Sequence, residues 1–228
     1  MLIINNGVQK SGSSLVQRLL QKALKPVPPS TEWQSEGWSN PSVPPEKLGG
    51  YYKSGEWREQ TVLLKMHLRY LPEFRFLTTD PDVRVIVSRR NLPDTVVSYF
   101  HHQVRRGEAQ PEDRKTWMET VGRARAFAAA AYQTSWRNQP NSYVVRFEDM
   151  LSDPLPNLEG LLAFLGHPVP QARCEKIIAS TIIRRNKNAE IHDGAFVRTA
   201  GLSQARQELP EDFYNELCRM DDELNALM

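Results

Sequence analysis

Residues 2–20 read LIINNGVQKSGSSLVQRLL, and this segment carries the first evidence for the fold class. Leu2–Asn5 is short, apolar and partly β-branched, as a buried strand is. Residues 7–14 are rich in glycine and serine, and the apolar residues between Leu15 and Leu20 recur at helical spacing. The stretch therefore predicts a strand, a short loop and a helix in direct succession.

The loop between this strand and this helix has the composition of an anion-binding turn. Backbone N–H groups of such a loop converge at the N-terminus of the helix, where the helix dipole also favours negative charge. Lys10 adds a cation, and three hydroxyl donors follow at Ser11, Ser13 and Ser14. A solvated turn with a capping serine has the same composition, so the loop alone leaves both interpretations open. The P-loop nucleotide-triphosphatase signature is not met, because Ser13 and Ser14 stand where it requires lysine and then serine or threonine.

The rest of the chain continues the alternation of strands and helices. Apolar, β-rich runs predict three more strands, at residues 61–67, 83–88 and 142–147. Helical spacing predicts helices that end near residue 105 and that span residues 116–137, 155–165, 171–180 and 211–227. This alternation predicts one α/β domain over residues 1–228, with a mainly parallel central sheet flanked by helices.

Composition narrows the class of partner. The 29 basic and 27 acidic residues nearly balance, so the net charge of +2 calls for neither nucleic acid nor a membrane surface. Residues 1–110 hold 15 basic and 10 acidic residues, so the first half is where we expect an anionic ligand. Two cysteines, no leader-like start and no long apolar window favour the cytoplasm and exclude a membrane span.

The order of residues in the first loop points to a particular family. The lysine precedes the second glycine, and the segment Lys-Ser-Gly-Ser-Ser at residues 10–14 resembles the Pro-Lys-Ser-Gly-Thr-Thr loop of sulfotransferases. Those enzymes use 3′-phosphoadenosine 5′-phosphosulfate (PAPS). The resemblance implies a P-loop-like strand–loop–helix that holds the 5′-phosphosulfate through Lys10, Ser11, Gly12, Ser13 and Ser14.

A second segment, Leu-Leu-Lys-Met-His at residues 63–67, resembles the family's strand that ends in Lys-x-His. Residues i and i+2 of a strand share one face, so Lys65 and His67 would point into the same site. A histidine whose pKa is near neutral can take a proton from an alcohol. A lone histidine at a strand end is more often structural, but the resemblance makes His67 the general base.

A third segment follows the strand at residues 83–88. Five residues keep the spacing of the family's Arg-Asn-Pro-x-Asp and Ser-Tyr pattern, although the proline has moved by one place: Arg90, Asn91, Asp94, Ser98 and Tyr99. Asn91 is also a predicted N-cap. The resemblance makes Arg90 and Ser98 ligands of the 3′-phosphate, for which a guanidinium fork is well suited. A dibasic turn before a helix with a buried serine is the alternative, and it gives no reason for this spacing.

Three later segments agree in order. Phe-Glu-Asp-Met at residues 147–150 resembles the family's Tyr-Glu-Asp-Met, and residues 180–181 fall where the family has Thr-Ser; both lie near the adenine in that family. Residues 196–201 are similar to a run that closes over the 3′-phosphate. The implied donor contacts are Phe147, Ser180, Thr181, Arg198, Thr199 and Ala200. Four positions depart from the family's residue types: Leu15, Phe147, Thr199 and Ala200. At position 15 the family usually has an aromatic residue that helps to hold the adenine. These departures put adenine contacts and donor affinity in question.

The resemblance implies an enzyme that moves a sulfuryl group from PAPS to a hydroxyl or amine of a small molecule and releases 3′,5′-adenosine bisphosphate (PAP). It gives His67 the role of base and places Lys10 on the bridging oxygen of the leaving phosphate. Lys65 and Ser98 would steady the sulfuryl group. No metal is expected, because the five histidines and two cysteines form no constellation with ligand spacing.

The acceptor is less constrained. Six prolines between residues 26 and 45 exclude a regular helix or central strand there. Aromatic residues accompany them, and residues 26–60 are predicted to form an acceptor-site loop within the domain: Trp33, Trp38, Tyr51, Tyr52 and Trp57. They could line a lid over an alcohol, a phenol or a sugar, or they could anchor the loop onto the core. The family's C-terminal dimer signature is missing, which leaves the oligomeric state open.

Two other functions share parts of these patterns. A nucleotide-dependent kinase would need a metal-binding acid after a strand, and the strand ends carry Lys65 to His67 and Arg89 to Arg90 instead. A nucleic-acid-binding domain could use the arginines at residues 89, 90, 105 and 106 and the basic run Arg-Arg-Asn-Lys at residues 184–187, but a net charge of +2 supports it weakly.

Overall fold

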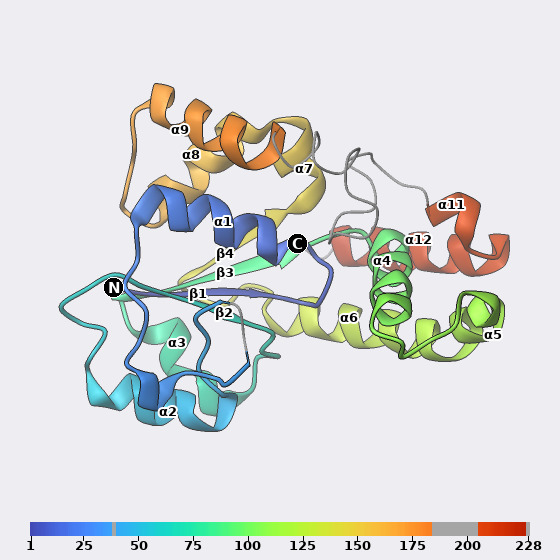
Figure 1. Cartoon of the computed structure of the whole chain (residues 1–228), viewed down its shortest axis with the longest axis horizontal. Helices are drawn as coiled ribbons and strands as arrows, with labels where there is room; N and C mark the ends of the chain where they lie inside the picture. Colours follow the sequence, from blue (N-terminus) through green and yellow to red (C-terminus); the bar gives the residue numbers. More distant parts are fainter. Residues whose placement is uncertain (38–39, 184–204, 227–228) are drawn as a thin grey trace.

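The computed structural model describes residues 1–37, 40–183 and 205–226 of the 228-residue chain. Its centre is a four-stranded sheet in the order β2-β1-β3-β4, and all three pairs of neighbouring strands are parallel (Figure 1). The strands are β1 (Leu2–Gly7), β2 (Val62–Met66), β3 (Val83–Arg89) and β4 (Ser142–Arg146). The predicted α/β class with a mainly parallel sheet is confirmed.

Helices cover both faces of the sheet (Figure 1). The strand residues Ile3, Leu63 and Ile86 point toward one face and form a core with the helices above it. These are α1 (Ser13–Leu24), α8 (Pro154–Phe164) and α9 (Gln171–Ile178). Ile4 and Val85 point toward the opposite face, because successive residues of a strand alternate. That face is covered by α2 (Pro45–Ser54), α3 (Phe76–Thr79) and α6 (Arg123–Ser135).

A further group of helices lies beyond the carboxyl ends of the strands (Figure 1). It contains α4 (Leu92–Arg105), α5 (Arg114–Trp117), α11 (Ala205–Glu208) and α12 (Glu211–Ala226), while α7 (Phe147–Ser152) follows β4 directly. Asn91 caps α4 as predicted, since its Oδ1 accepts a hydrogen bond of 2.8 Å from the backbone N–H of Asp94. The shorter turns are η1 (Thr31–Trp33), η2 (Pro72–Phe74), η3 (Pro111–Asp113), η4 (Met118–Gly122) and η5 (Ala179–Ile183).

The helix predicted over residues 116–137 is confirmed as an unbroken helical run over residues 114–135, which contains a π turn that the sequence did not predict. The structure has α5, the π-helical turn η4 and α6 in succession. Gly122 ends the π turn at a place where a Cβ would come within 3.1 Å of the Trp117 ring and 3.3 Å of Val96. The widened turn therefore seats the helix closely on its neighbours, which the alanine-rich composition does not reveal.

The proline-rich segment follows the prediction, since the described residues between 26 and 44 hold the short turn η1 and an isolated bridge from Val27 to Val62, and α2 begins only at Pro45. Tyr51 and Trp57 are fully buried in the core, and Trp33 packs on Tyr51 with ring centroids 5.8 Å apart. These aromatics anchor the segment, whereas Trp38 lies outside the described residues. Residues 26–60 as an acceptor-site loop stay a prediction. None of the helices in the described ranges is long and apolar enough to cross a membrane.

Candidate active site

The site is built where the parallel strands end. β1 lies between β2 and β3, so the chain leaves β1 toward one side of the sheet and later leaves β3 toward the other. In open α/β sheets, a crevice for ligands forms outside the carboxyl ends at such a switch point. Gly7 at the end of β1 pairs with Ser88 near the end of β3. The segments after these two strands, around Lys10 and Arg90, therefore start side by side.

The loop after β1 turns sharply into α1. Lys10 and Gly12 both have left-handed backbones, with φ of 74° and 95°. Gly12 is the N-cap of α1 and has no side chain with which to cap the helix. The N–H groups of Leu15 and Val16 donate to the carbonyl oxygen of Gly12, which leaves those of Ser13 and Ser14 at the start of the helix to face an anion. A Cβ on Gly12 would lie 2.5 Å from Cδ2 of Phe147. Glycine is thus required here both by its backbone conformation and by the close approach of an aromatic ring.

The three serines of the loop are placed differently. The Oγ of Ser14 accepts a hydrogen bond of 2.6 Å from the Nζ of Lys65, which joins the first and second predicted segments. Ser11 is 1% exposed, and its Oγ packs against Gly7 without a hydrogen-bond partner among the described residues. Ser13 is buried, and its carbonyl accepts from Asn5. Leu15 is buried in the core beneath α1, so its side chain is not presented at the loop.

His67 lies one residue beyond β2 and contacts the end of β1. Its Nδ1 hydrogen bonds to the carbonyl oxygen of Gly7, and because a carbonyl can only accept, Nδ1 carries the proton. In the neutral ring, Nε2 then holds the lone pair. Burial lowers the pKa of His67, the bond to Gly7 opposes this, and the cations Lys65 and Arg125 lower the pKa further. The imidazole is therefore held neutral, which is the state a general base needs.

Two buried asparagines position these groups. Asn5 donates to the carbonyl of Ser13 at 2.9 Å and to Gln17 at 2.8 Å, which fixes the start of α1. Asn6 donates to the carbonyl of Leu68 at 2.9 Å and accepts from the N–H of Leu68 at 2.8 Å, which fixes the segment that carries His67. β1 runs two residues past its predicted end because both side chains find partners inside the protein.

The turn after β3 is tied to the turn after β4. Glu148 accepts from Asn91 twice, from its backbone N–H at 3.0 Å and from its side-chain amide at 2.7 Å. The Arg90 guanidinium lies over the Phe147 ring, with Cζ 4.7 Å from the centroid, and approaches Asp94 at 3.8 Å. Phe147 therefore touches both Arg90 and the loop at Gly12.

Within the described ranges, the other predicted residues have no contact with the loop or with Arg90 among the interactions given above. Ser98 lies on α4 one turn after Asp94 and is half-buried. Ser180 receives hydrogen bonds from Lys22 in the last turn of α1, at 3.0 Å to its carbonyl and 2.8 Å to its hydroxyl, which places Ser180 away from the loop. Thr181 is buried. Arg198, Thr199 and Ala200 lie outside the described residues.

One cation of the site, Arg125, could not be predicted from the sequence. Arg125 projects from α6, with its guanidinium over the Tyr99 ring at 4.1 Å and a hydrogen bond of 3.1 Å to Gln9 in the loop. It also acts on the pKa of His67. Nothing in the alanine-rich helix marks this arginine, because its role depends on how α6 packs. Within the described ranges, no group of three or more His, Cys, Asp or Glu could hold a metal ion.

Comparison with known proteins places this site in context. The family model described as the sulfotransferase domain matches residues 2–220. Sulfotransferase 4A1 of Mus musculus is 34% identical over 125 residues, which are 51% of this chain and 43% of that protein. Sulfotransferase 1A1 of Canis lupus familiaris is 25% identical over 134 residues, 55% of this chain and 44% of that protein. The matches thus span less than half the length of these relatives.

Solved structures share the fold. Retinol dehydratase, in complex with androsterone and the inactive cofactor PAP, superposes with a TM-score of 0.66 at 16% identity, over 98% of this chain and 80% of that one. Mouse sulfotransferase SULT7A1 complexed with PAP gives a TM-score of 0.56 at 19% identity, over 98% of this chain and 82% of that one. At these identities the likeness establishes the architecture.

Proposed function

Because the chain belongs to the sulfotransferase family, we propose that it transfers a sulfuryl group from PAPS to a hydroxyl or amine of a small molecule. One observation carries the proposal. The glycine loop after β1 and Arg90 after β3 meet through the ring of Phe147, while His67 is bonded to Gly7 at the start of the same loop. Two candidate anion-binding groups therefore follow the neighbouring strands β1 and β3, and the neutral imidazole follows β2 on the other side of β1.

The residues present fit a donor that carries two phosphates. At the loop, the N-terminus of α1 and the cations Lys10 and Lys65 suit the 5′-phosphosulfate. At the turn after β3, the guanidinium of Arg90 suits the 3′-phosphate, with Ser98 on the same helix face as Asp94. The ring of Phe147 lies between these two groups and offers a surface for the nucleoside.

PAPS supplies an activated sulfuryl group when it is bound. The chain's own residues hold and move the proton: Nε2 of His67 takes it from the acceptor hydroxyl, while the bond from Nδ1 to Gly7 keeps the ring in the required tautomer. Lys10 stabilises charge that develops on the leaving phosphate. Lys65, held by Ser14, and Ser98 orient the sulfuryl group for in-line attack.

The finer assignments belong to the same proposal. Ser180, Thr181, Arg198, Thr199 and Ala200 are proposed as further donor contacts on the strength of the motif order alone. The acceptor is proposed to be an alcohol, phenol, sugar or amine that enters beside residues 26–60. A cytoplasmic location is proposed because Cys174 and Cys218 are both free thiols.

A ligand screen tests the proposal directly. The melting temperature of the purified chain is measured with PAP, with ATP plus magnesium and with no nucleotide, and PAPS turnover is then followed over a panel of acceptors. We expect PAP to stabilise the protein without metal and more strongly than ATP. Stabilisation by magnesium-ATP with no response to PAP would favour a kinase and refute the proposal.

A further inference from the structure

Arg125 is a cation beside the proposed base, and the sulfuryl transfer described above gives it no role. The ring of His67 bonds to the carbonyl of Gly7, and Nη2 of Arg125 donates to Oε1 of Gln9 at 3.1 Å. One short segment of the loop therefore holds both side chains. Arg125 is also one of the cations that lower the pKa of His67, which places its charge near the imidazole because such effects weaken with distance.

The charge of Arg125 is not balanced within the described part of the chain. Burial lowers the pKa of Arg125, and the group that opposes this shift is Tyr99 and not a carboxylate. Arg123, on the same helix, instead pairs with Glu216. Partly buried cations are usually paired with an acid, because removing a charge from water is costly. Arg125 therefore has the surroundings of an anion-binding residue.

One end of this guanidinium is open to a ligand. Its face lies over the ring of Tyr99, with Cζ 4.1 Å from the centroid, and Nη2 is bonded to Gln9. The Nε atom is enclosed and cannot be reached. The Nη1 group is not enclosed, and it has no hydrogen-bond partner among the described residues. An anion would therefore meet Arg125 through Nη1.

Arg125 reaches the site from the side opposite to the helix that is proposed to hold the donor. The N-terminus of α1 is proposed to hold the 5′-phosphosulfate, and α1 and α6 cover opposite faces of the sheet (Figure 1). Tyr51 and Trp57 of residues 26–60 pack on the same face as α6, and the acceptor is proposed to enter beside these residues. An anion at Arg125 would thus belong to the acceptor and not to the nucleotide.

We propose that the acceptor is a small hydroxy compound that carries a carboxylate, and that Arg125 binds this carboxylate while the hydroxyl faces Nε2 of His67. A monoanion matches the single unbalanced guanidinium, and a carboxylate matches the planar N–H donors of arginine. The carboxylate takes no part in the bond changes, so Arg125 determines specificity. The inference rests on the sulfuryl transfer proposed above and names the class of its acceptor.

Titration calorimetry at constant ionic strength tests this without turnover. The probes are 4-hydroxyphenylacetate and its neutral amide, 4-hydroxyphenylacetamide, and each is titrated into the full chain with and without saturating PAP. We expect the acid to bind at least tenfold more tightly than the amide, as one charge-assisted hydrogen bond provides. An acid that does not bind, or that binds no more tightly than the amide, would overturn the inference.

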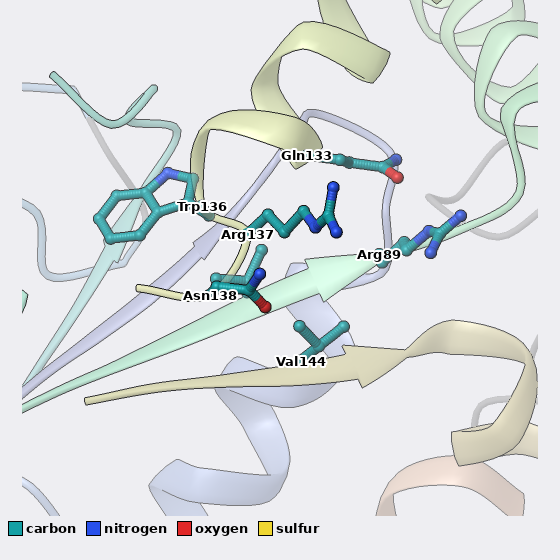
Figure 2. Close-up of a pocket in the computed structure, with 7 residues that line it drawn as sticks. Arg89, Gln133, Trp136, Arg137, Asn138 and Val144 are labelled. Atoms are coloured by element: carbon teal, nitrogen blue, oxygen red, sulfur yellow. The ribbon is translucent and has the colours of Figure 1, made fainter. Parts of the chain in front are cut away.

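Two variants of Arg125 and a matched control locate the effect. Arg125→Gln should reduce the affinity for the acid to that for the amide, and Arg125→Glu should bind the cationic phenol tyramine more tightly than the acid. Arg137, beyond the end of α6, also has an enclosed Nε without a partner among the described residues, but it lines a small cavity with Arg89 and Val144 (Figure 2). Arg137→Gln should therefore keep the preference for the acid. Urea unfolding checks that each variant folds, and a preference that survives Arg125→Gln would overturn the assignment.

Turnover separates this inference from the proposed function. The ratio of kcat/KM for the acid to that for the amide should fall at least tenfold in Arg125→Gln, and effects of the substitution on His67 or on the donor cancel in this ratio. Equal losses for both acceptors would place Arg125 on the sulfuryl group and overturn the inference. A chain that fails to bind PAP would refute the sulfuryl transfer, whereas one that binds PAP and shows no preference for the acid would refute the acceptor class alone.

Discussion

Replacing Gly12 by alanine probes the contact on which the site is built. Two effects oppose the new Cβ: the backbone has φ of 95°, and the Cβ would lie 2.5 Å from the ring of Phe147. A left-handed conformation costs an alanine about 1–2 kcal/mol, and overpacking a filled interior costs about 1–3 kcal/mol. Gly12→Ala should therefore lower the free energy of unfolding by about 2–5 kcal/mol.

Gly55→Ala is the matched control for this prediction. Gly55 also has a left-handed backbone, with φ of 73°, but a Cβ there would meet nothing within 4 Å. Its substitution should cost only the conformational part, about 1–2 kcal/mol. Urea denaturation measures both variants, and the difference between them isolates the clash with Phe147.

A double-mutant cycle completes the experiment. If the clash is real, Phe147→Leu in the Gly12→Ala background should destabilise the protein less than Phe147→Leu does alone, because the smaller side chain makes room for the Cβ. Equal costs for Gly12→Ala and Gly55→Ala, or no coupling between positions 12 and 147, would show that the loop and Phe147 do not touch. The bridge from the loop to Arg90 would then be refuted.

Three further predictions concern His67 and its support. His67→Ala should retain PAP binding yet lose turnover by about 10²-fold or more. His167→Ala, at an exposed position, should change neither PAP binding nor turnover. Normal turnover by His67→Ala would exclude His67 as the base. Burial and neighbouring cations lower the pKa of His67, so kcat/KM should be flat near neutral pH and fall only as the pH drops through a value below about 6.5; a loss that begins above pH 7 would contradict this. Asn6→Ala removes both side-chain bonds to Leu68, so it should cost about 1–3 kcal/mol of stability and lower kcat with PAP affinity unchanged. Asn157→Ala, which loses two hydrogen bonds on α8, should leave kcat unchanged. A normal kcat for Asn6→Ala would show that Asn6 does not position His67.

Local patterns in the sequence predicted the framework well. The four strands begin and end within two residues of the predicted positions. The cap of α4 could be predicted because Asn91 bonds to a backbone group only three residues away. Such features depend on neighbours along the chain. The resemblance to sulfotransferases assigned Lys65 and the loop to the same donor, and the hydrogen bond from Lys65 to Ser14 joins these two segments.

Other features depended on packing that no local pattern encodes. The burial of Ser11 and Leu15 follows from how the loop and α1 lie against the sheet, and the roles of Asn5 and Asn6 follow from partners that are distant in sequence. Two consecutive asparagines inside an apolar strand were the available signal, since such residues are buried only when they are hydrogen-bonded. Arg125 had no comparable signal.

The most direct test of the central claim compares the affinities of PAP and adenosine 5′-phosphate for the wild-type chain and for Arg90→Gln. If the loop and Arg90 grip the two phosphates of one nucleotide, the wild-type chain binds PAP at least tenfold more tightly, and Arg90→Gln removes that preference while retaining affinity for the 5′-phosphate. A wild-type chain that binds both nucleotides equally, or an Arg90→Gln variant that keeps the preference, would contradict the account.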